Sequence, residues 1–153
     1  MRCIALALAL LLTAGLGAEL LGLVNHNPGN IRAHSIKGWN GATGLDPWLY
    51  LQFQTDLDGL RAMRRVLRAY DRKHHLHTVA AICNRWVGPP RSNKDVVDHR
   101  DYILAVAQRL EVRENELIYL DDPTTLKAIA RAIVYAENGM DPFSDRLYEQ
   151  AFP

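Results

Sequence analysis

Hydrophobic residues at helical spacing predict a helix that begins after Asp122 and ends before Gly139. Asp122 is a suitable N-cap, and Pro123 suits the first helical position because its missing N–H has no partner there in any case. Apolar side chains follow at spacings of three and four, and Glu137 continues their face of the helix. Gly139 supplies the left-handed residue that commonly ends a helix, so Glu137 is expected in the last turn.

Three more helices are predicted upstream of this segment. Their apolar stripes indicate one helix over residues 56–73, a second after Thr78 and a third that runs from Val96 to Leu110. The second and third helices are separated by residues 88–90, Gly-Pro-Pro, because proline cannot continue a helix.

A small antiparallel flap is predicted within residues 31–54. Leu49, Leu51 and Phe53 alternate with more polar residues, as expected for a short strand with one buried face. Together with the helices, this predicts a mainly α fold, an α+β domain with a small β flap.

The N-terminal residues 1–18 resemble a signal peptide, with Arg2 at the start, an apolar centre and small residues before the expected cleavage site. A second interpretation keeps the segment: residues 3–24 are about long enough to span a bilayer as a weak anchor, although Glu19 interrupts them. In either case the protein is expected outside the cytoplasmic membrane, exported to the periplasm or associated with a virion. Residues 19–153 are then expected to form one catalytic domain.

The composition supports one compact domain, because 48% of the 153 residues are hydrophobic and 23% are charged. The net charge of +1 does not indicate nucleic acid as a partner. Cys3 lies in the targeting segment, which leaves Cys83 without a disulfide partner. The triplet His74, His75 and His77 is best explained as a solvated helix end, since no carboxylate or cysteine stands at ligand spacing. We expect neither a metal nor a cofactor.

The position of Glu137 is unfavourable for a negative charge. A helix C-terminus carries about half a negative charge, and the apolar stripe removes water, so both effects should raise the pKa of Glu137. A carboxylic acid that stays protonated near neutral pH can protonate the leaving oxygen of a glycosidic bond. The alternative is a structural glutamate that turns to solvent or pairs with an arginine such as Arg131.

Residues 129–144, I-A-R-A-I-V-Y-A-E-N-G-M-D-P-F-S, resemble the catalytic helix of lytic murein transglycosylases and goose-type lysozymes. In that family the glutamate is the sole acid and base, so the resemblance implies that role for Glu137. Asn138 stands where the family has serine.

A wider resemblance covers most of the chain after the targeting segment. The segments N-P-G-N-I-R at residues 27–32, W-N-G at 39–41 and T-V-A-A-I-C-N-R-W-V-G-P-P at 78–90 are similar to phage-derived lytic proteins, often labelled phage structural proteins. The resemblance implies a lysozyme-like fold. Members usually carry a glutamate where this chain has Ser92, which leaves Glu137 as the stronger acid. Because Glu137 follows the Y-x-x-x-V segment at residues 102–106, that fold would be circularly permuted.

The resemblance implies a lytic transglycosylase that cleaves the β-1,4 bond between N-acetylmuramic acid and N-acetylglucosamine. Its partners would be peptidoglycan glycan strands, with the protein a monomer unless it is part of a virion. A hydrolytic muramidase and a non-catalytic peptidoglycan-binding or virion structural protein remain open. The amide-rich segment 25–32 is either a structural turn or a cleft wall. The residues expected to contact sugar are Asn27, Asn30, Arg32, Trp86, Asn93, Tyr102 and Asn138.

Overall fold

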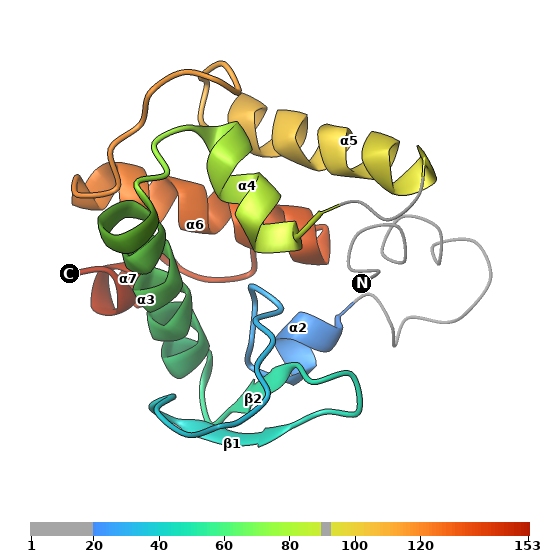
Figure 1. Cartoon of the computed structure of the whole chain (residues 1–153). Coiled ribbons are helices and arrows are strands. Elements are labelled where there is room, and N and C mark those ends of the chain that lie inside the picture. The colour runs from blue at the N-terminus through green and yellow to red at the C-terminus, as the bar shows by residue number, and fades with distance from the viewer. Residues whose placement is uncertain (1–19, 90–92) are drawn as a thin grey trace.

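The structure is a computed structural model that describes residues 20–89 and 93–153. It is mostly helical, with one two-stranded antiparallel sheet (Figure 1). The described helices are α2 (Leu21–Val24), α3 (Asp56–His74), α4 (Val79–Val87), α5 (Asn93–Arg109), α6 (Pro123–Asn138) and α7 (Asp145–Ala151); the strands are β1 (Ala42–Leu45) and β2 (Leu51–Phe53).

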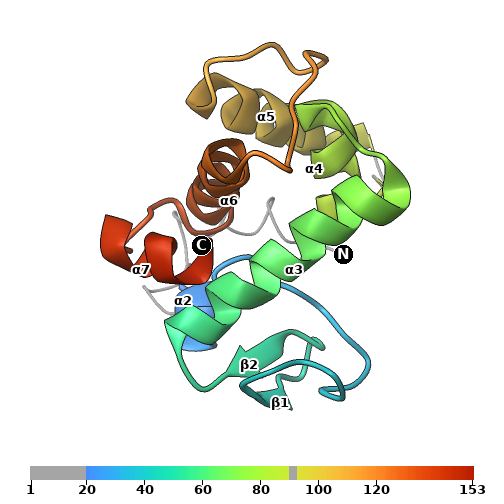
Figure 2. The ribbon, with the colours of Figure 1, turned by 90° about the vertical axis from the view of Figure 1, so that its left-hand side faces the viewer.

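The flap and the short helix α2 lie at one end of the molecule, and α4, α5 and α6 lie at the other (Figure 1). Helix α3 runs between the two ends, from the flap to α4 (Figure 2). It packs against α6, α7 and β2, while α5 packs against both α4 and α6. The core fills the space between these helices with fully buried side chains: Leu60, Met63, Leu67, Ile82, Val106, Leu126, Ile129, Ile133 and Tyr148.

Local capping rules place the helix starts where the sequence predicts them. The side-chain oxygen of Thr78 accepts the backbone N–H of Ala81 at 3.2 Å, and Asp122 accepts that of Thr125 at 2.8 Å. At the other end of α6, Gly139 has φ +71° and donates its N–H to the carbonyl of Tyr135 at 2.8 Å. The helix predicted between Asp122 and Gly139 is confirmed.

The flap is confirmed, but the buried face predicted for its second strand is wrong at one end. Leu51 and Phe53 are buried, whereas Leu49 is 42% exposed and Tyr50 is buried in its place. Leu49 has φ +68° in a turn that Asp46 holds by accepting the N–H groups of Trp48 and Tyr50, each at 2.9 Å. Because Leu49 has a left-handed backbone, the alternation of buried and exposed side chains changes just before the strand begins, and Tyr50 is buried where Leu49 was expected.

The third predicted helix is confirmed as α5, but Val96 does not belong to its buried stripe, since it is 53% exposed. The buried face begins at His99, whose Nε2 lies 2.6 Å from the Asn84 side-chain oxygen on α4. The sequence did not predict α2 or α7, because each is too short to show a clear hydrophobic period.

The signal peptide predicted for residues 1–18 lies outside the described residues, and of the anchor predicted for residues 3–24 only residues 20–24 are described, which include α2. Among the residues that the structure describes, no helix is both long enough and apolar enough to cross a membrane.

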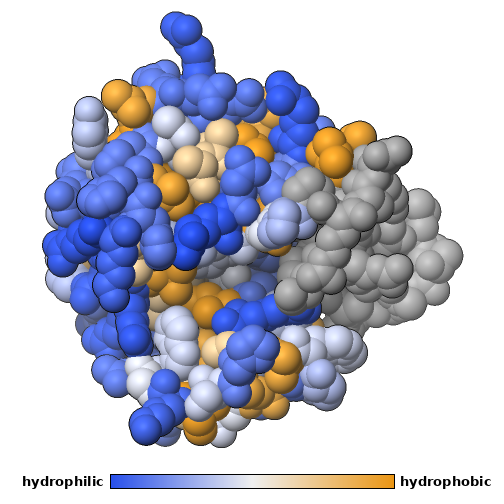
Figure 3. Space-filling model, in the orientation of Figure 1, coloured by the Kyte–Doolittle hydropathy of each residue, from blue (hydrophilic) through white to orange (hydrophobic). Residues whose placement is uncertain are grey.

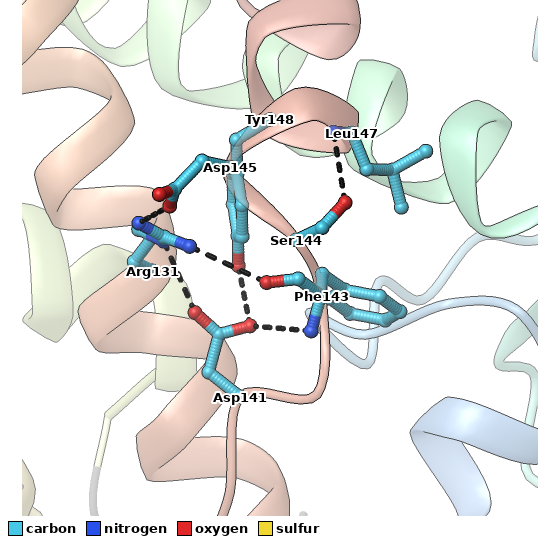
Figure 4. A network of polar contacts seen from close by, with 7 residues as sticks. All are labelled: Arg131, Asp141, Phe143, Ser144, Asp145, Leu147 and Tyr148. Atoms are coloured by element: carbon cyan, nitrogen blue, oxygen red, sulfur yellow. Dashed lines mark hydrogen bonds and ion pairs between the residues drawn. The ribbon is translucent and has the colours of Figure 1, made fainter.

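Arg131 on α6 binds the loop that follows the helix, so the predicted alternative of an Arg131–Glu137 pair is wrong (Figure 4). Its guanidinium donates to Asp141 at 3.2 Å, to Asp145 at 2.6 Å and to the Phe143 carbonyl at 3.3 Å. The Tyr148 hydroxyl completes the network by donating to Asp141 at 3.1 Å. These contacts attach α7 to α6 and fix the turn after the last residue of α6.

The loop of residues 25–32 lies in direct contact with α3 at Gly59. A Cβ atom built on Gly59 would lie 1.9 Å from the His26 carbonyl oxygen and 2.9 Å from Pro28 Cδ. Only glycine leaves room for this approach, which presses the loop into the space between α3 and α6.

Gly59→Ala is expected to destabilise the protein by about 3 kcal/mol or more, because the methyl group must displace backbone. In an unobstructed helix interior the same change stabilises by about 1 kcal/mol. Chemical denaturation measures the difference. Gly44→Ala is the control, since the added Cβ would meet only the end of the Gln52 side chain, 2.9 Å away; its expected effect is about 1 kcal/mol or less. A stabilised Gly59→Ala variant would contradict the proposed close packing.

Candidate active site

Glu137 lies in the last turn of α6 and is 4% exposed. Its two carboxyl oxygens accept hydrogen bonds from different elements. The Asn30 side-chain nitrogen donates to Oε2 at 3.0 Å, and the Tyr102 hydroxyl on α5 donates to Oε1 at 3.0 Å. The carboxyl therefore joins the N-terminal loop, α5 and α6.

The environment raises the pKa of Glu137 from its usual value of 4.5 to about 7, chiefly because burial removes water from the charged form. Hydrogen bonds from Asn30 and Tyr102 oppose this shift in the pKa, since each stabilises the carboxylate. The predicted raised pKa is confirmed, and the group is poised to hold or release a proton near neutral pH.

Asn27 is fully buried and organises the loop. Its side-chain nitrogen donates to the carbonyls of Ile31 and Leu51, each at 2.9 Å, and its oxygen accepts the Ile31 N–H at 2.9 Å. With no exposed surface and these three bonds made, Asn27 acts as a structural turn residue. The expectation that it contacts sugar is wrong for this reason.

Asn138 is also buried, and it fastens the loop to α6. Its side-chain nitrogen donates to the Pro28 carbonyl at 2.7 Å and to the Val134 carbonyl at 2.8 Å. The predicted sugar contact at Asn138 is replaced by this role in holding the loop beside the carboxyl. Tyr102, which is 2% exposed, likewise serves the carboxyl through its hydroxyl.

Asn30, Arg32 and Trp86 keep part of their surface exposed. Trp86 donates its indole N–H to the Gly29 carbonyl at 3.2 Å, which places the ring beside the loop. The Arg32 guanidinium lies 4.2 Å above the ring of Tyr50 and donates to its hydroxyl at 2.9 Å. Asn30 and Arg32 belong to the loop of residues 25–32, and Trp86 lies against it. The side chain of Asn93 lies outside the described residues.

The sequence did not predict that Gly22 and Cys83 lie beside the site. Gly22 approaches the amides that surround the carboxyl so closely that a Cβ there would lie 2.6 Å from Asn138 Oδ1 and 2.9 Å from Asn30 Oδ1. Cys83, buried on α4, has its pKa raised to about 12 by burial and by the charge of Glu137. Because its thiol stays protonated, Cys83 is a poor nucleophile. No signal in one sequence places Gly22, since its role depends on residues more than a hundred positions away.

Across residues 20–89 and 93–153, no group of three or more histidine, cysteine, aspartate or glutamate side chains is arranged to hold a metal ion. The face seen in Figure 3 is recessed at its centre, between the helical end of the molecule and the flap. Polar and apolar residues both border this recess.

The chain matches no known protein-family model. It is 34% identical over 127 residues to protein P5 of Pseudoalteromonas phage PM2, and the alignment covers 80% of this chain and 74% of that protein. The chain belongs to the protein P5 family. It is therefore a relative of a bacteriophage protein, and the name P5 states no activity.

The raised pKa makes the stability of this P5-family protein depend on pH. As the pH rises from about 4.5 to about 7, the unfolded chain loses the Glu137 proton while the folded chain keeps it, so the folded state loses stability over that window. Glu137→Gln removes the effect. Its advantage in unfolding free energy over the wild type should grow by about 3 kcal/mol between about pH 4 and pH 8.

Urea denaturation at a series of pH values measures this advantage. Glu149→Gln is the control, because it makes the same substitution at an exposed position on α7. An advantage of Glu137→Gln that does not change with pH would contradict the raised pKa.

Proposed function

We propose that this P5-family protein is a peptidoglycan-degrading lytic transglycosylase that uses Glu137 as its single acid and base. The substrate is the β-1,4 bond between N-acetylmuramic acid and N-acetylglucosamine. Its proposed place of action is the periplasm, reached by export or as part of a virion. The relationship to a phage protein is compatible with a virion.

The observation that carries this proposal is the buried carboxyl of Glu137 with its pKa near 7. A general acid is most effective when its pKa lies close to the working pH. Structural glutamates commonly pair with cations, whereas here the nearby Arg131 is bound to Asp141 and Asp145. The donors that reach Glu137, Asn30 and Tyr102, are neutral and hold its orientation.

The proposed reaction needs one carboxyl group in two protonation states. Protonated Glu137 gives its proton to the glycosidic oxygen as the bond from that oxygen to C1 of the muramyl residue breaks. The resulting carboxylate takes the proton of the muramyl C6 hydroxyl while O6 bonds to C1. The product is a 1,6-anhydro sugar, and Glu137 is protonated again.

A lysozyme-like, circularly permuted fold is part of the proposal. The helical arrangement with one small flap is compatible with it, and so is a glutamate that lies near the C-terminal end of the chain. Asn30, Arg32 and Trp86 are the proposed sugar contacts. Each is partly exposed, and each lies either in the loop of residues 25–32 or against it. Planar amide and guanidinium groups suit acetamide and hydroxyl groups, and an indole suits the face of a pyranose ring.

A hydrolytic muramidase is the second candidate. It would need a second carboxylate besides Glu137, and Asp46, Asp56 and Asp98 are the residues considered for it. Asp46 and Asp56 are engaged, the first by Asn25 and backbone N–H groups and the second by His26 at 2.7 Å. Asp98 has a buried Oδ2 atom without a hydrogen-bond partner and lies one turn before Tyr102 on α5. Of the three, Asp98 is the one with a buried carboxyl oxygen left to bind a water.

Glu137→Gln should lower the release of anhydro-muropeptides from murein sacculi by about 10²–10⁴-fold, because glutamine cannot deliver a proton. The wild-type rate should fall as the pH rises through about 7, where Glu137 loses its proton. Mass spectrometry of the released fragments measures both effects and separates the reactions, since a hydrolase adds water to the product and a transglycosylase does not.

Glu149→Gln serves as the control and should retain the wild-type rate. Equal release by Glu137→Gln and the wild type would refute the catalytic role of Glu137. No release from sacculi by any folded form would instead favour a non-catalytic P5-family structural protein. Hydrated products that disappear in Asp98→Asn would establish the muramidase.

A further inference from the structure

Two side-chain amide oxygens lie unpartnered beside Gly22. Asn30 Oδ1 and Asn138 Oδ1 are both buried without a donor. A Cβ atom built on Gly22 would lie 2.9 Å from the first and 2.6 Å from the second, so the two oxygens share one small space. A buried acceptor without a donor costs free energy, and two that face the same space also repel each other.

The two amides differ in how firmly they are oriented. The Asn138 nitrogen donates to two backbone carbonyls, at 2.7 and 2.8 Å, which fixes its oxygen toward Gly22. The Asn30 nitrogen has one partner, Glu137 Oε2 at 3.0 Å. Because the oxygen and nitrogen of an amide have nearly the same size, a half-turn of the Asn30 amide needs no repacking.

We propose that the Asn30 amide turns over when Glu137 takes up a proton, so that it accepts from the acid and donates to Asn138. With Glu137 ionised, the Asn30 nitrogen donates to Oε2, as observed. With a proton on Oε2, the same orientation would bring two donors together. After the half-turn, Asn30 Oδ1 accepts the Glu137 proton and the Asn30 nitrogen donates to Asn138 Oδ1. Both unpartnered oxygens are then satisfied.

Asn30 and Asn138 are thus positioning residues that stabilise both protonation states of one carboxyl. The importance of this for catalysis rests on the proposed function, in which Glu137 alternates between acid and base. Among the described residues, the titratable groups beside Glu137 on neighbouring helices are the Tyr102 phenol on α5 and the Cys83 thiol on α4. Burial keeps the Cys83 thiol neutral near pH 7, and the proposal assigns the response to the Glu137 proton to the amides.

The test is an NMR titration of the full chain that follows the side-chain carboxyl carbon of Glu137, identified by its absence in Glu137→Gln. Asn138→Ala removes the acceptor needed by the turned amide, so the midpoint should fall by about half to one pH unit, the scale of one lost hydrogen bond. Asn138→Ser tests the same loss with a residue that keeps a polar side chain. Asn30→Ala removes a partner from both states and should leave the midpoint nearly unchanged.

The side-chain amide signals of Asn30 should titrate with the midpoint of Glu137 in the wild type. Asn84→Ala is the control, since the Asn84 amide pairs with His99 and should not affect the carboxyl. The proposal fails if both Asn138 variants keep the wild-type midpoint, or if Asn30→Ala raises it as the loss of a fixed donor would.

This titration does not depend on turnover. If the midpoints move as expected and sacculi stay intact, the amide exchange stands and the proposed enzyme function fails. If anhydro-muropeptides are released while the midpoints stay fixed, the function stands and the amide exchange fails.

Discussion

The structure depends on the close packing of the loop of residues 25–32 between α3 and α6. Gly59 lets the His26 carbonyl approach α3 within the space of a methyl group, and Asn138 holds the Pro28 carbonyl from the other side. Within this loop, the Asn27 side chain makes hydrogen bonds to the backbone carbonyl and N–H of Ile31, so these buried polar groups have partners. Since the Asn30 N–H closes this turn on the Asn27 carbonyl at 2.9 Å, the short Asn30 side chain is held where it reaches Glu137.

The pKa of Glu137 is set by a balance between burial, which raises it, and neutral hydrogen-bond donors, which lower it. Burial alone would hold Glu137 firmly protonated, and a nearby cation would hold it firmly ionised. Tyr102 and Asn30 offset only part of the desolvation, and Arg131 is occupied by the turn after α6. The result is a carboxyl for which neither protonation state is strongly preferred at neutral pH.

Features with a local cause could be predicted from the sequence. The start of α6 at Asp122, its end at Gly139 and the burial of Glu137 all follow from residues within one helix. Features with a distant cause could not. The exposure of Val96 depends on where α4 and α6 cover α5, and the burial of Tyr50 depends on a left-handed Leu49. The site residues Asn30 and Tyr102 were predicted as sugar contacts. In a sequence, an asparagine or tyrosine that binds a sugar cannot be distinguished from one that donates to a neighbouring carboxyl.

The pairing of Asn30 with Glu137 spans 107 residues. A chain emerging from the ribosome presents the loop, the flap and α3 long before α6 exists. Until α6 has been made and has packed, the loop lacks both the carboxyl and the Asn138 amide that anchors Pro28. The order of synthesis thus keeps the loop apart from the carboxyl until α6 has been made, so a chain that stops before α6 carries no assembled site.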